Sequence, residues 1–115
     1  MSTRLIRHTV IAALSDMSNP SYASARSLIE KLADADGVNV ISCQSLLRAL
    51  AVFDTPKRRH EAMDLVTHLC RILPIHESDI GEAIRTISAS PKTSLEDAVE
   101  SAFTARIKPD EIVDL

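Results

Sequence analysis

The carboxylate of Asp97 is the side chain in this sequence best placed to do chemistry. It stands in the run at residues 93–99, shortly ahead of a second acidic run at residues 109–114. A carboxylate on the first turn of a helix, followed by a short apolar strand, is one corner of a layout that binds divalent metal ions. Such hard cations prefer oxygen ligands, and a bound ion can activate water and offset charge that builds up on a phosphate. A metal site would therefore need further carboxylates close to Asp97.

Asp97 also has a structural explanation that needs no metal. If Ser94 is the N-cap of a helix, Asp97 lies at the third helical position and can form a capping-box-like pair. If Thr93 is the cap, Glu96 takes that place. A carboxylate in the first turn is also favoured by the helix dipole. Asp97 is thus a cap, a working metal ligand or a remnant with no present role.

The other reactive residue types lack the spacing of familiar catalytic motifs. His60, His68 and His76 do not have the four-residue spacing that places two metal ligands on one helical face, and no HExxH motif is present. The sequence also has no GxSxG elbow and no glycine-rich phosphate loop. Cys43 and Cys70 lie in apolar stretches without CxxC spacing, which predicts two buried free thiols and a reducing compartment.

A basic cluster lies near the middle of the chain and contains Lys57, Arg58 and Arg59. It could contact an RNA backbone, or it could be the solvated start of a helix. The first 60 residues carry eight Lys and Arg against five Asp and Glu, whereas the rest of the chain carries five against eleven. We therefore expect a basic surface near this cluster and an acidic surface near the C-terminus, without a generally basic nucleic-acid binder.

The composition is that of one ordinary globular domain, which we assign to residues 1–115. Hydrophobic residues make up 45% of the 115 residues and charged residues 25%. The apolar run at residues 10–14 follows Arg4 and Arg7 but is shorter than the roughly 7–15 residues of a signal-peptide core. No run approaches the roughly 18 apolar residues of a membrane span, so we expect a cytoplasmic protein without a membrane partner.

Short apolar runs alternate with amphipathic segments along the chain. Apolar and β-branched runs predict strands at residues 38–42, 72–75 and 111–113, with a further strand or strand–helix junction at residues 5–11. Apolar side chains at spacings of three and four predict the helices between these runs. We expect Ser42 or Ser45 to cap one helix and Ser78–Asp79 to cap another, and Pro74 to mark a bend or an edge strand.

Strands that are separated by one or two helices imply parallel pairing through right-handed crossovers. We therefore predict an α/β fold, a three-layer α/β/α sandwich with a small parallel sheet and helices on both faces. In such sheets the functional site lies outside the carboxyl ends of the strands, at the topological switch point. The residues that follow the strands are the ones to search for chemistry.

This layout resembles the PIN domain, the nuclease fold of many bacterial toxin–antitoxin ribonucleases. The resemblance covers nearly the whole chain and is carried by short segments in the right order and spacing, at residues 40–47, 72–75, 94–98 and 110–113. It implies three or four carboxylates around one or two Mg²⁺ or Mn²⁺ ions, and it implies RNA cleavage.

At two of the family's carboxylate positions this sequence has arginine. The resemblance places Arg7 where an aspartate follows the first strand, and Arg48 where a glutamate stands on the helix after the second strand. Asp97 matches the third carboxylate. The fourth would follow the last strand, but the sequence ends at Asp114 and Leu115, before the family's closing element. An arginine stays charged near pH 7 and repels a divalent ion, so tight metal binding is not expected.

The resemblance and its departures imply a degenerate PIN-like domain that lacks metal-dependent nuclease activity and needs no cofactor. Arg7 and Arg48 could bind phosphate, remain solvated, or form an internal ion pair with Asp97. The remaining role would be contact with nucleic acid such as RNA, or association with a protein such as an antitoxin. An open sheet edge or apolar patch also favours a homodimer. The alternative is an active Mg²⁺- or Mn²⁺-dependent ribonuclease with an atypical site that includes Asp97. A third interpretation is a helical interaction domain that only mimics this pattern.

Overall fold

Strands and helices alternate along the chain in the computed structural model, which describes residues 2–115. The elements in chain order are β1 (Thr3–Ile6), α1 (His8–Ala12), a 3₁₀ turn η1 (Ala13–Ser15), α2 (Ser21–Asp34), β2 (Val38–Ser42), α3 (Cys43–Leu50), α4 (Pro56–Leu69), β3 (Arg71–Leu73), α5 (Glu77–Ala89), α6 (Leu95–Ile107) and β4 (Glu111–Val113). No helix in this described part of the chain is long and apolar enough to cross a membrane. The strands exclude the interpretation of a purely helical domain.

The sheet has four parallel strands in the order β3-β2-β1-β4. β1 lies in the interior, and its Leu5 stands opposite Val40 of β2 and Ile112 of β4. β3 is an edge strand, as Pro74 directly after it suggested. The parallel pairing confirms the predicted crossover topology, and it brings the carboxyl ends of all strands to one side of the sheet.

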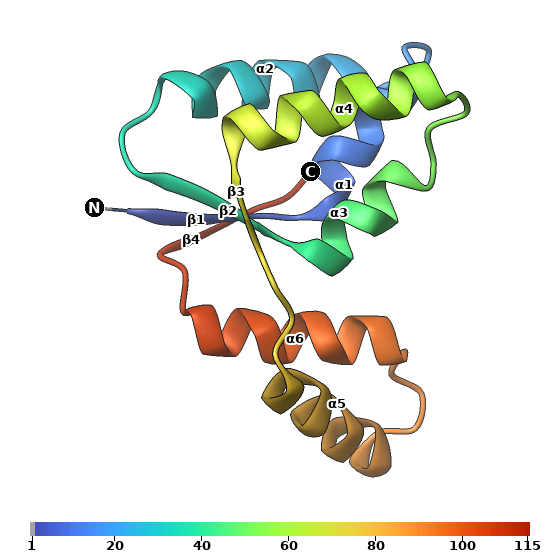
Figure 1. The fold of residues 1–115 in the computed structure, drawn as a ribbon, viewed down its shortest axis with the longest axis vertical. Coiled ribbons are helices and arrows are strands. Elements are labelled where there is room, and N and C mark those ends of the chain that lie inside the picture. Colours follow the sequence, from blue (N-terminus) through green and yellow to red (C-terminus); the bar gives the residue numbers. More distant parts are fainter. Residues whose placement is uncertain (1) are drawn as a thin grey trace.

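Helices cover both faces of the sheet, as the alternation of apolar side chains along the strands requires (Figure 1). Ile6 and Ile41 pack in one core with apolar residues of α1, α2, α3 and α4. The neighbouring residues Leu5 and Val40 point to the opposite face, where they pack against Phe103 of α6. The predicted three-layer α/β/α sandwich is therefore confirmed.

The helix α5 forms an outlying layer, because it packs on α6 on the side away from the sheet (Figure 1). Ala83 of α5 meets Ala98 and Val99 of α6 in a small core of their own. Small side chains allow the two helices to approach closely. The helix α6 consequently lies between α5 and the sheet and is held from both sides.

At two helices the structure selects one of the two caps that the sequence left open, Ser42 for α3 and Ser94 for α6. The hydroxyl of Ser42 accepts a hydrogen bond from the backbone N–H of Ser45 at 3.0 Å, and the hydroxyl of Ser94 accepts one from the N–H of Asp97 at 3.1 Å. Both caps have an extended backbone, as N-cap residues usually do. The Ser42 cap starts α3 directly after β2. The Ser94 cap fixes the start of α6, which lies beside α3.

The predicted start of α5 was wrong by two residues. The N-cap is His76, and α5 begins at Glu77 rather than after Ser78–Asp79. Asp79 is the third helical residue, and its carboxylate accepts the backbone N–H of His76 at 2.9 Å, which completes a capping box. The strand before it was also misplaced: β3 spans Arg71–Leu73 instead of residues 72–75.

Candidate functional site

Charged side chains gather where the strands end. Arg7 and His8 follow β1, Arg48 lies on α3 after β2, and Asp114 follows β4. The backbone N–H of Arg7 donates to the carbonyl of Val113 at 3.0 Å, which ties the start of α1 to the end of β4. The first turns of α6 complete the group. We call these side chains the strand-end site, which comprises Arg7, His8, Arg48, Asp97, Glu100 and Asp114.

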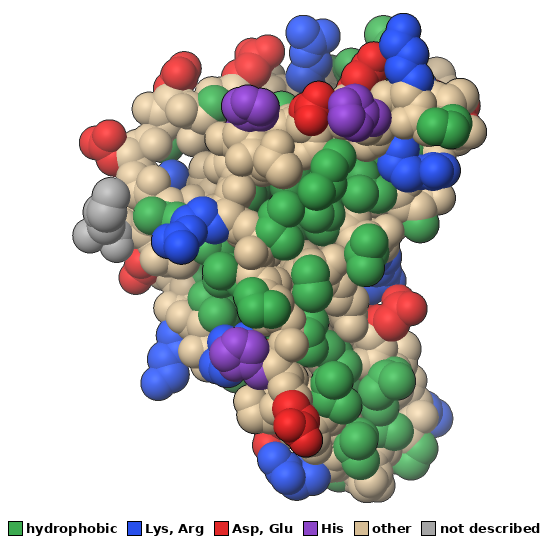
Figure 2. All heavy atoms as spheres, in the orientation of Figure 1, with side chains coloured by type: hydrophobic (Ala, Val, Ile, Leu, Met, Phe, Trp, Pro, Cys, Tyr) green, Lys and Arg blue, Asp and Glu red, His purple; other side chains and the backbone are tan. Residues whose placement is uncertain are grey.

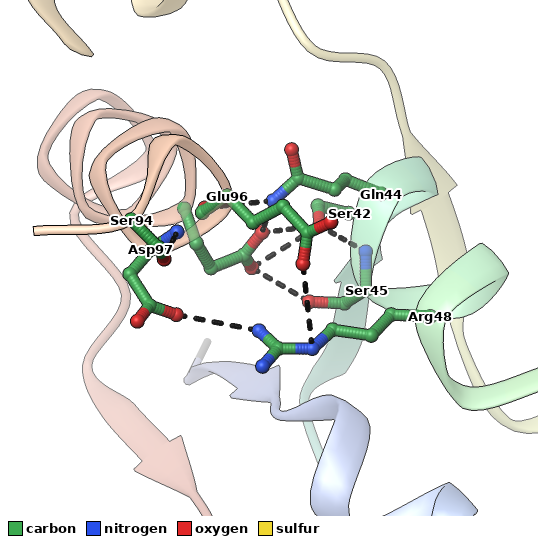
Figure 3. Close-up of polar contacts among 8 residues, drawn as sticks. Ser42, Gln44, Ser45, Arg48, Ser94, Glu96 and Asp97 are labelled. Carbon is green, nitrogen blue, oxygen red and sulfur yellow. Dashed lines mark hydrogen bonds and ion pairs between the residues drawn. The ribbon is translucent and has the colours of Figure 1, made fainter. Parts of the chain in front are cut away.

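Arg48 of α3 forms an ion pair with Asp97 of α6 (Figure 3). Its Nη1 lies 3.3 Å from Oδ1 of Asp97, and its Nε lies 3.8 Å from Oε2 of Glu96. The pair is open to solvent, since 40% of the Arg48 side chain and 64% of the Asp97 side chain are exposed. Of the alternatives that the sequence left for Arg48, the internal ion pair is therefore the one present here.

The carboxylate of Asp97 has its pKa lowered below its ordinary value. The hydroxyl of Ser94 is the largest cause, and hydrogen bonding by Arg48 is the second. Both stabilise the ionised form, because each offers a donor to the negative oxygen atoms. Asp97 is thus an anion at neutral pH that already has protein partners, one of which is a permanent cation.

Glu100 is a further carboxylate of this site, and the sequence analysis missed it. It is 6% exposed, and its oxygen atoms accept hydrogen bonds from the hydroxyls of Ser42 at 2.8 Å and Ser45 at 2.9 Å. The amide of Gln44 lies 3.4 Å from Oε2 of Glu100 and donates to the carbonyl of Glu96 at 2.9 Å. These contacts join the start of α3 to α6 across the layers of the fold.

One signal in the sequence could have identified Glu100. It follows Asp97 by three residues, which places both carboxylates on the same side of a helix. Its flanks, however, resemble core, because Val99 and Phe103 are apolar. The serine partners lie 58 and 55 residues away in the sequence, so only the crossover topology brings them together.

Asp114 is held at the end of β4 by the hydroxyl of Thr9, which donates to its Oδ1. This hydrogen bond is the largest cause that lowers the pKa of Asp114, and the charge of Arg7 and that of His8 in its protonated form contribute less. The charge of Arg7 therefore stabilises the ionised form of Asp114. The carboxylate, like those of Asp97 and Glu100, has a donor from the protein.

His8 lies among both signs of charge. Its pKa is lowered from 6.5, first by burial and then by the charge of Arg48. The carboxylates of Asp114, Glu100 and Asp97 act in the opposite direction but do not reverse the shift. The imidazole is therefore mostly neutral at pH 7, so Arg7 and Arg48 supply the lasting positive charge of the site.

Two arginines of the basic cluster, for which the sequence left RNA contact or a solvated helix start open, make contacts within the fold. Arg58 donates to the carbonyl of Leu14 at 3.1 Å and lies over the ring of Phe53, 5.8 Å from its centroid. Arg59 donates to the carbonyls of Phe53 at 2.9 Å and Leu50 at 3.3 Å. Both guanidinium groups therefore stabilise the connection between α3 and α4. Lys57 lies in the first turn of α4 and is exposed.

The donor set at the strand-end site does not suit the divalent ions that the resemblance implies. Within residues 2–115, no group of three or more His, Cys, Asp and Glu side chains is arranged to hold a metal ion. Asp97 faces the guanidinium of Arg48, and Glu100 is taken up by serine hydroxyls. A metal beside Asp97 would have to approach a fixed positive charge at close range.

Comparison with known proteins identifies the fold but no sequence relative. No protein-family model matches the sequence, and no curated protein matches it. Among solved structures, the chain is similar to VapC20 of Mycobacterium tuberculosis, described as a toxin that cleaves the sarcin–ricin loop. The TM-score is 0.75 at 13% sequence identity, and the match covers 97% of this chain and 88% of that one. The predicted PIN-like fold is therefore confirmed.

Proposed function

We propose that this chain is a PIN-like domain that contacts nucleic acid at its strand-end site and uses no divalent metal. The observation that carries the proposal is the 3.3 Å ion pair between Arg48 and Asp97. A guanidinium stays charged at any physiological pH, so Asp97 has a positive charge beside it at every such pH. It also repels a metal ion from the position where such an ion would have to bind.

The same charges favour contact with phosphate groups. Arginine presents several N–H donors in a plane and binds phosphate oxygen atoms well. Arg48 is 40% exposed at its side chain, and Arg7 is partly exposed at the start of α1. The structurally similar VapC20 is described as cleaving the sarcin–ricin loop, which supports nucleic acid as the partner class.

The test is Mn²⁺ titration by calorimetry together with an RNA cleavage assay. We expect no saturable Mn²⁺ binding and no Mn²⁺-dependent cleavage by the purified chain. Glu61→Gln is a suitable control, because Glu61 is an exposed carboxylate on α4. Metal-dependent cleavage that Asp97→Asn abolishes and Glu61→Gln leaves intact would falsify the proposal.

A second candidate is an Mg²⁺- or Mn²⁺-dependent ribonuclease, and one observation favours it. Glu100 adds a buried carboxylate beside Asp97 and Asp114, so the strand-end site has one more acidic group than the sequence pattern indicated. In that case Arg48 would have to move away from Asp97 when metal binds. The cleavage assay separates this candidate from the first, with Glu100→Gln as an added variant.

We further propose that the chain associates with a second copy through apolar side chains on its helices. Leu47 of α3, Ile84 of α5 and Leu95 of α6 are 68%, 57% and 55% exposed. Figure 2 shows apolar side chains gathered over the region of α5. Exposed apolar patches on globular proteins commonly mark interaction surfaces.

Light scattering at micromolar concentration tests this association. We expect a dimer, and we expect Ile84→Glu to convert it to a monomer by placing a charge in the interface. Met17→Glu is the matched control, because Met17 is 73% exposed and lies before α2. A monomeric unchanged chain would remove the proposed self-association.

A further inference from the structure

A cavity of about 500 Å³ opens beside Arg48, between α1, the start of α2 and α3. Its polar lining is supplied by His8, Thr9, Ser15, Asn19, Ser21 and Arg48. A few apolar side chains, including Val52, complete the wall. The volume lies within the roughly 300–1,000 Å³ that is usual for sites of small organic ligands.

Arg48 is the one permanently charged side chain in this lining, and no Asp or Glu side chain lines the cavity. The nearest carboxylates lie behind the lining, where Asp97 pairs with Arg48 and Asp114 accepts the hydroxyl of Thr9. His8 can donate a hydrogen bond into the cavity. A neighbouring cavity differs, since Asp16 and Asp54 line it together with Arg58. The cavity beside Arg48 is therefore suited to an anion that needs several hydrogen-bond donors.

We propose that this cavity binds a phosphate monoester, either on a free mononucleotide or at the end of an RNA chain. The inference rests on the proposed function, because it gives the nucleic-acid contact of Arg48 a defined ligand group. Arg48 is the main partner of the phosphate, and His8 and the hydroxyls of Ser15 and Ser21 are additional donors, while the hydroxyl of Thr9 already donates to Asp114. The apolar part of the wall takes the nucleoside side of the ligand.

The ion pair with Asp97 sets the strength of this binding. Arg48 directs Nη1 to Asp97 and Nε toward Glu96, so the phosphate competes with two carboxylates for one guanidinium. Removing the charge of Asp97 should release Arg48 toward the cavity. A purely structural role of Arg48 would not predict stronger binding in that variant.

The experiment is calorimetric titration of the whole chain with adenosine monophosphate, with adenosine as the ligand that lacks phosphate. We expect binding of adenosine monophosphate that inorganic phosphate competes away, and no binding of adenosine. Arg48→Gln should weaken the affinity roughly tenfold to a hundredfold, as expected for loss of a charged hydrogen-bond donor. Arg26→Gln is the matched control, because Arg26 is an exposed arginine of α2 paired with Glu30.

Asp97→Asn should strengthen binding of adenosine monophosphate roughly twofold to fivefold, the usual range for an exposed ion pair. Thermal unfolding of each variant shows whether it is folded. The inference is overturned if adenosine monophosphate does not bind, if adenosine binds equally well, or if the Arg48 and Arg26 variants lose the same affinity.

RNA of one sequence, carrying either a 5′-phosphate or a 5′-hydroxyl, identifies the source of the phosphate. Tighter binding of the phosphorylated RNA assigns the cavity to an RNA end, and equal binding of both assigns it to a free nucleotide. If only the inference about the cavity is wrong, the chain does not bind adenosine monophosphate and shows no Mn²⁺-dependent cleavage. Failure of the proposed function appears instead as Mn²⁺-dependent cleavage, so the two outcomes are distinguishable.

Discussion

Two arginine–aspartate pairs in this chain share their chemistry but differ in their surroundings. In the pair between α6 and α5, Arg106 holds Asp79 through Nε at 3.0 Å and Nη2 at 3.0 Å, and the Asp79 side chain is only 3% exposed. In the pair between α3 and α6, Arg48 reaches Asp97 through one contact at 3.3 Å in an exposed position. The first pair is bidentate and sheltered, and the second is single and open.

The difference shows which pair is committed to the fold. Asp79 also accepts the backbone N–H of His76, and Arg106 also donates to the carbonyl of Pro74 at 3.2 Å. That network joins α6, α5 and the segment that leads into α5. Arg48 keeps donors for other partners, because a guanidinium has five N–H groups. The sheltered pair therefore stabilises the structure, while the open pair leaves part of the Arg48 guanidinium exposed to solvent.

The largest expected effect is loss of stability when the sheltered pair is removed. Asp79→Ala should lower the free energy of unfolding by about 2–4 kcal/mol, because it deletes charged hydrogen bonds and half of the capping box. Part of the Arg106 side chain remains hydrated, which limits the loss. Asp97→Ala, made in parallel, should unfold at nearly the same urea concentration as the unchanged chain.

Urea denaturation followed by circular dichroism measures both variants. The contrast between the two pairs fails if the Asp97 variant loses as much stability as the Asp79 variant. An additional variant, Arg106→Met, should resemble Asp79→Ala, since it leaves the sheltered carboxylate without its cation.

The second effect is a dependence of stability on acid. Hydrogen bonding by Arg106 is the main cause that lowers the pKa of Asp79 below 3.8. A group with a lowered folded-state pKa contributes stability above its unfolded pKa, and that contribution is lost as pH falls through the folded pKa. We therefore expect the advantage of the unchanged chain over Asp79→Asn to be full at pH 6 and to shrink below about pH 4.

Urea midpoints at several pH values between 2 and 7 test this dependence. Asp97→Asn should show a much smaller change over the same range, because its carboxylate is exposed. A constant difference between the unchanged chain and Asp79→Asn at all pH values would contradict the role assigned to Arg106.

The two pairs also show what the sequence could predict. Periodicity and β-branched runs located β2 and β4 at their observed bounds, and serine caps located the starts of α3 and α6. These features depend on residues within a few positions of one another. The cap at His76 was missed because the capping carboxylate of Asp79 was itself taken as the helix start.

The buried charged side chains were harder to predict from the sequence than the strands and helix caps. Glu100 is hydrogen-bonded by Ser42 of β2 and Ser45 of α3, and the buried Arg4 donates to the side chain of Asn39 at 2.8 Å, 35 residues away. Local pattern alone assigns such side chains to the surface, because charged residues are seldom buried unless paired. The partners become visible only when the parallel topology places the segments side by side.

A third, smaller effect is expected from Arg48→Glu with Mn²⁺. This change removes the cation beside Asp97 and adds oxygen ligands near Glu100, so the site should gain weak metal affinity. At tenfold excess over the dissociation constant, bound metal would add about 1.4 kcal/mol to the free energy of unfolding. Thermal unfolding with and without Mn²⁺ measures the gain. The matched control is Arg85→Glu, an exposed arginine on α5, which should respond to no metal.

The smallest expected effect is that of Mn²⁺ or EDTA on the unchanged chain, which should not shift its unfolding temperature. A resident ion at a hundredfold excess would add about 2.7 kcal/mol, a shift that thermal unfolding resolves easily. Arg48 already pairs with Asp97, and Thr9 and the serines donate hydrogen bonds to Asp114 and Glu100, so the oxygen atoms that a metal would bind already have partners in the protein. Stabilisation by Mn²⁺ that EDTA reverses would mean that Arg48 moves away from Asp97 when the metal binds. The ion pair would then cover a metal site and would not replace it.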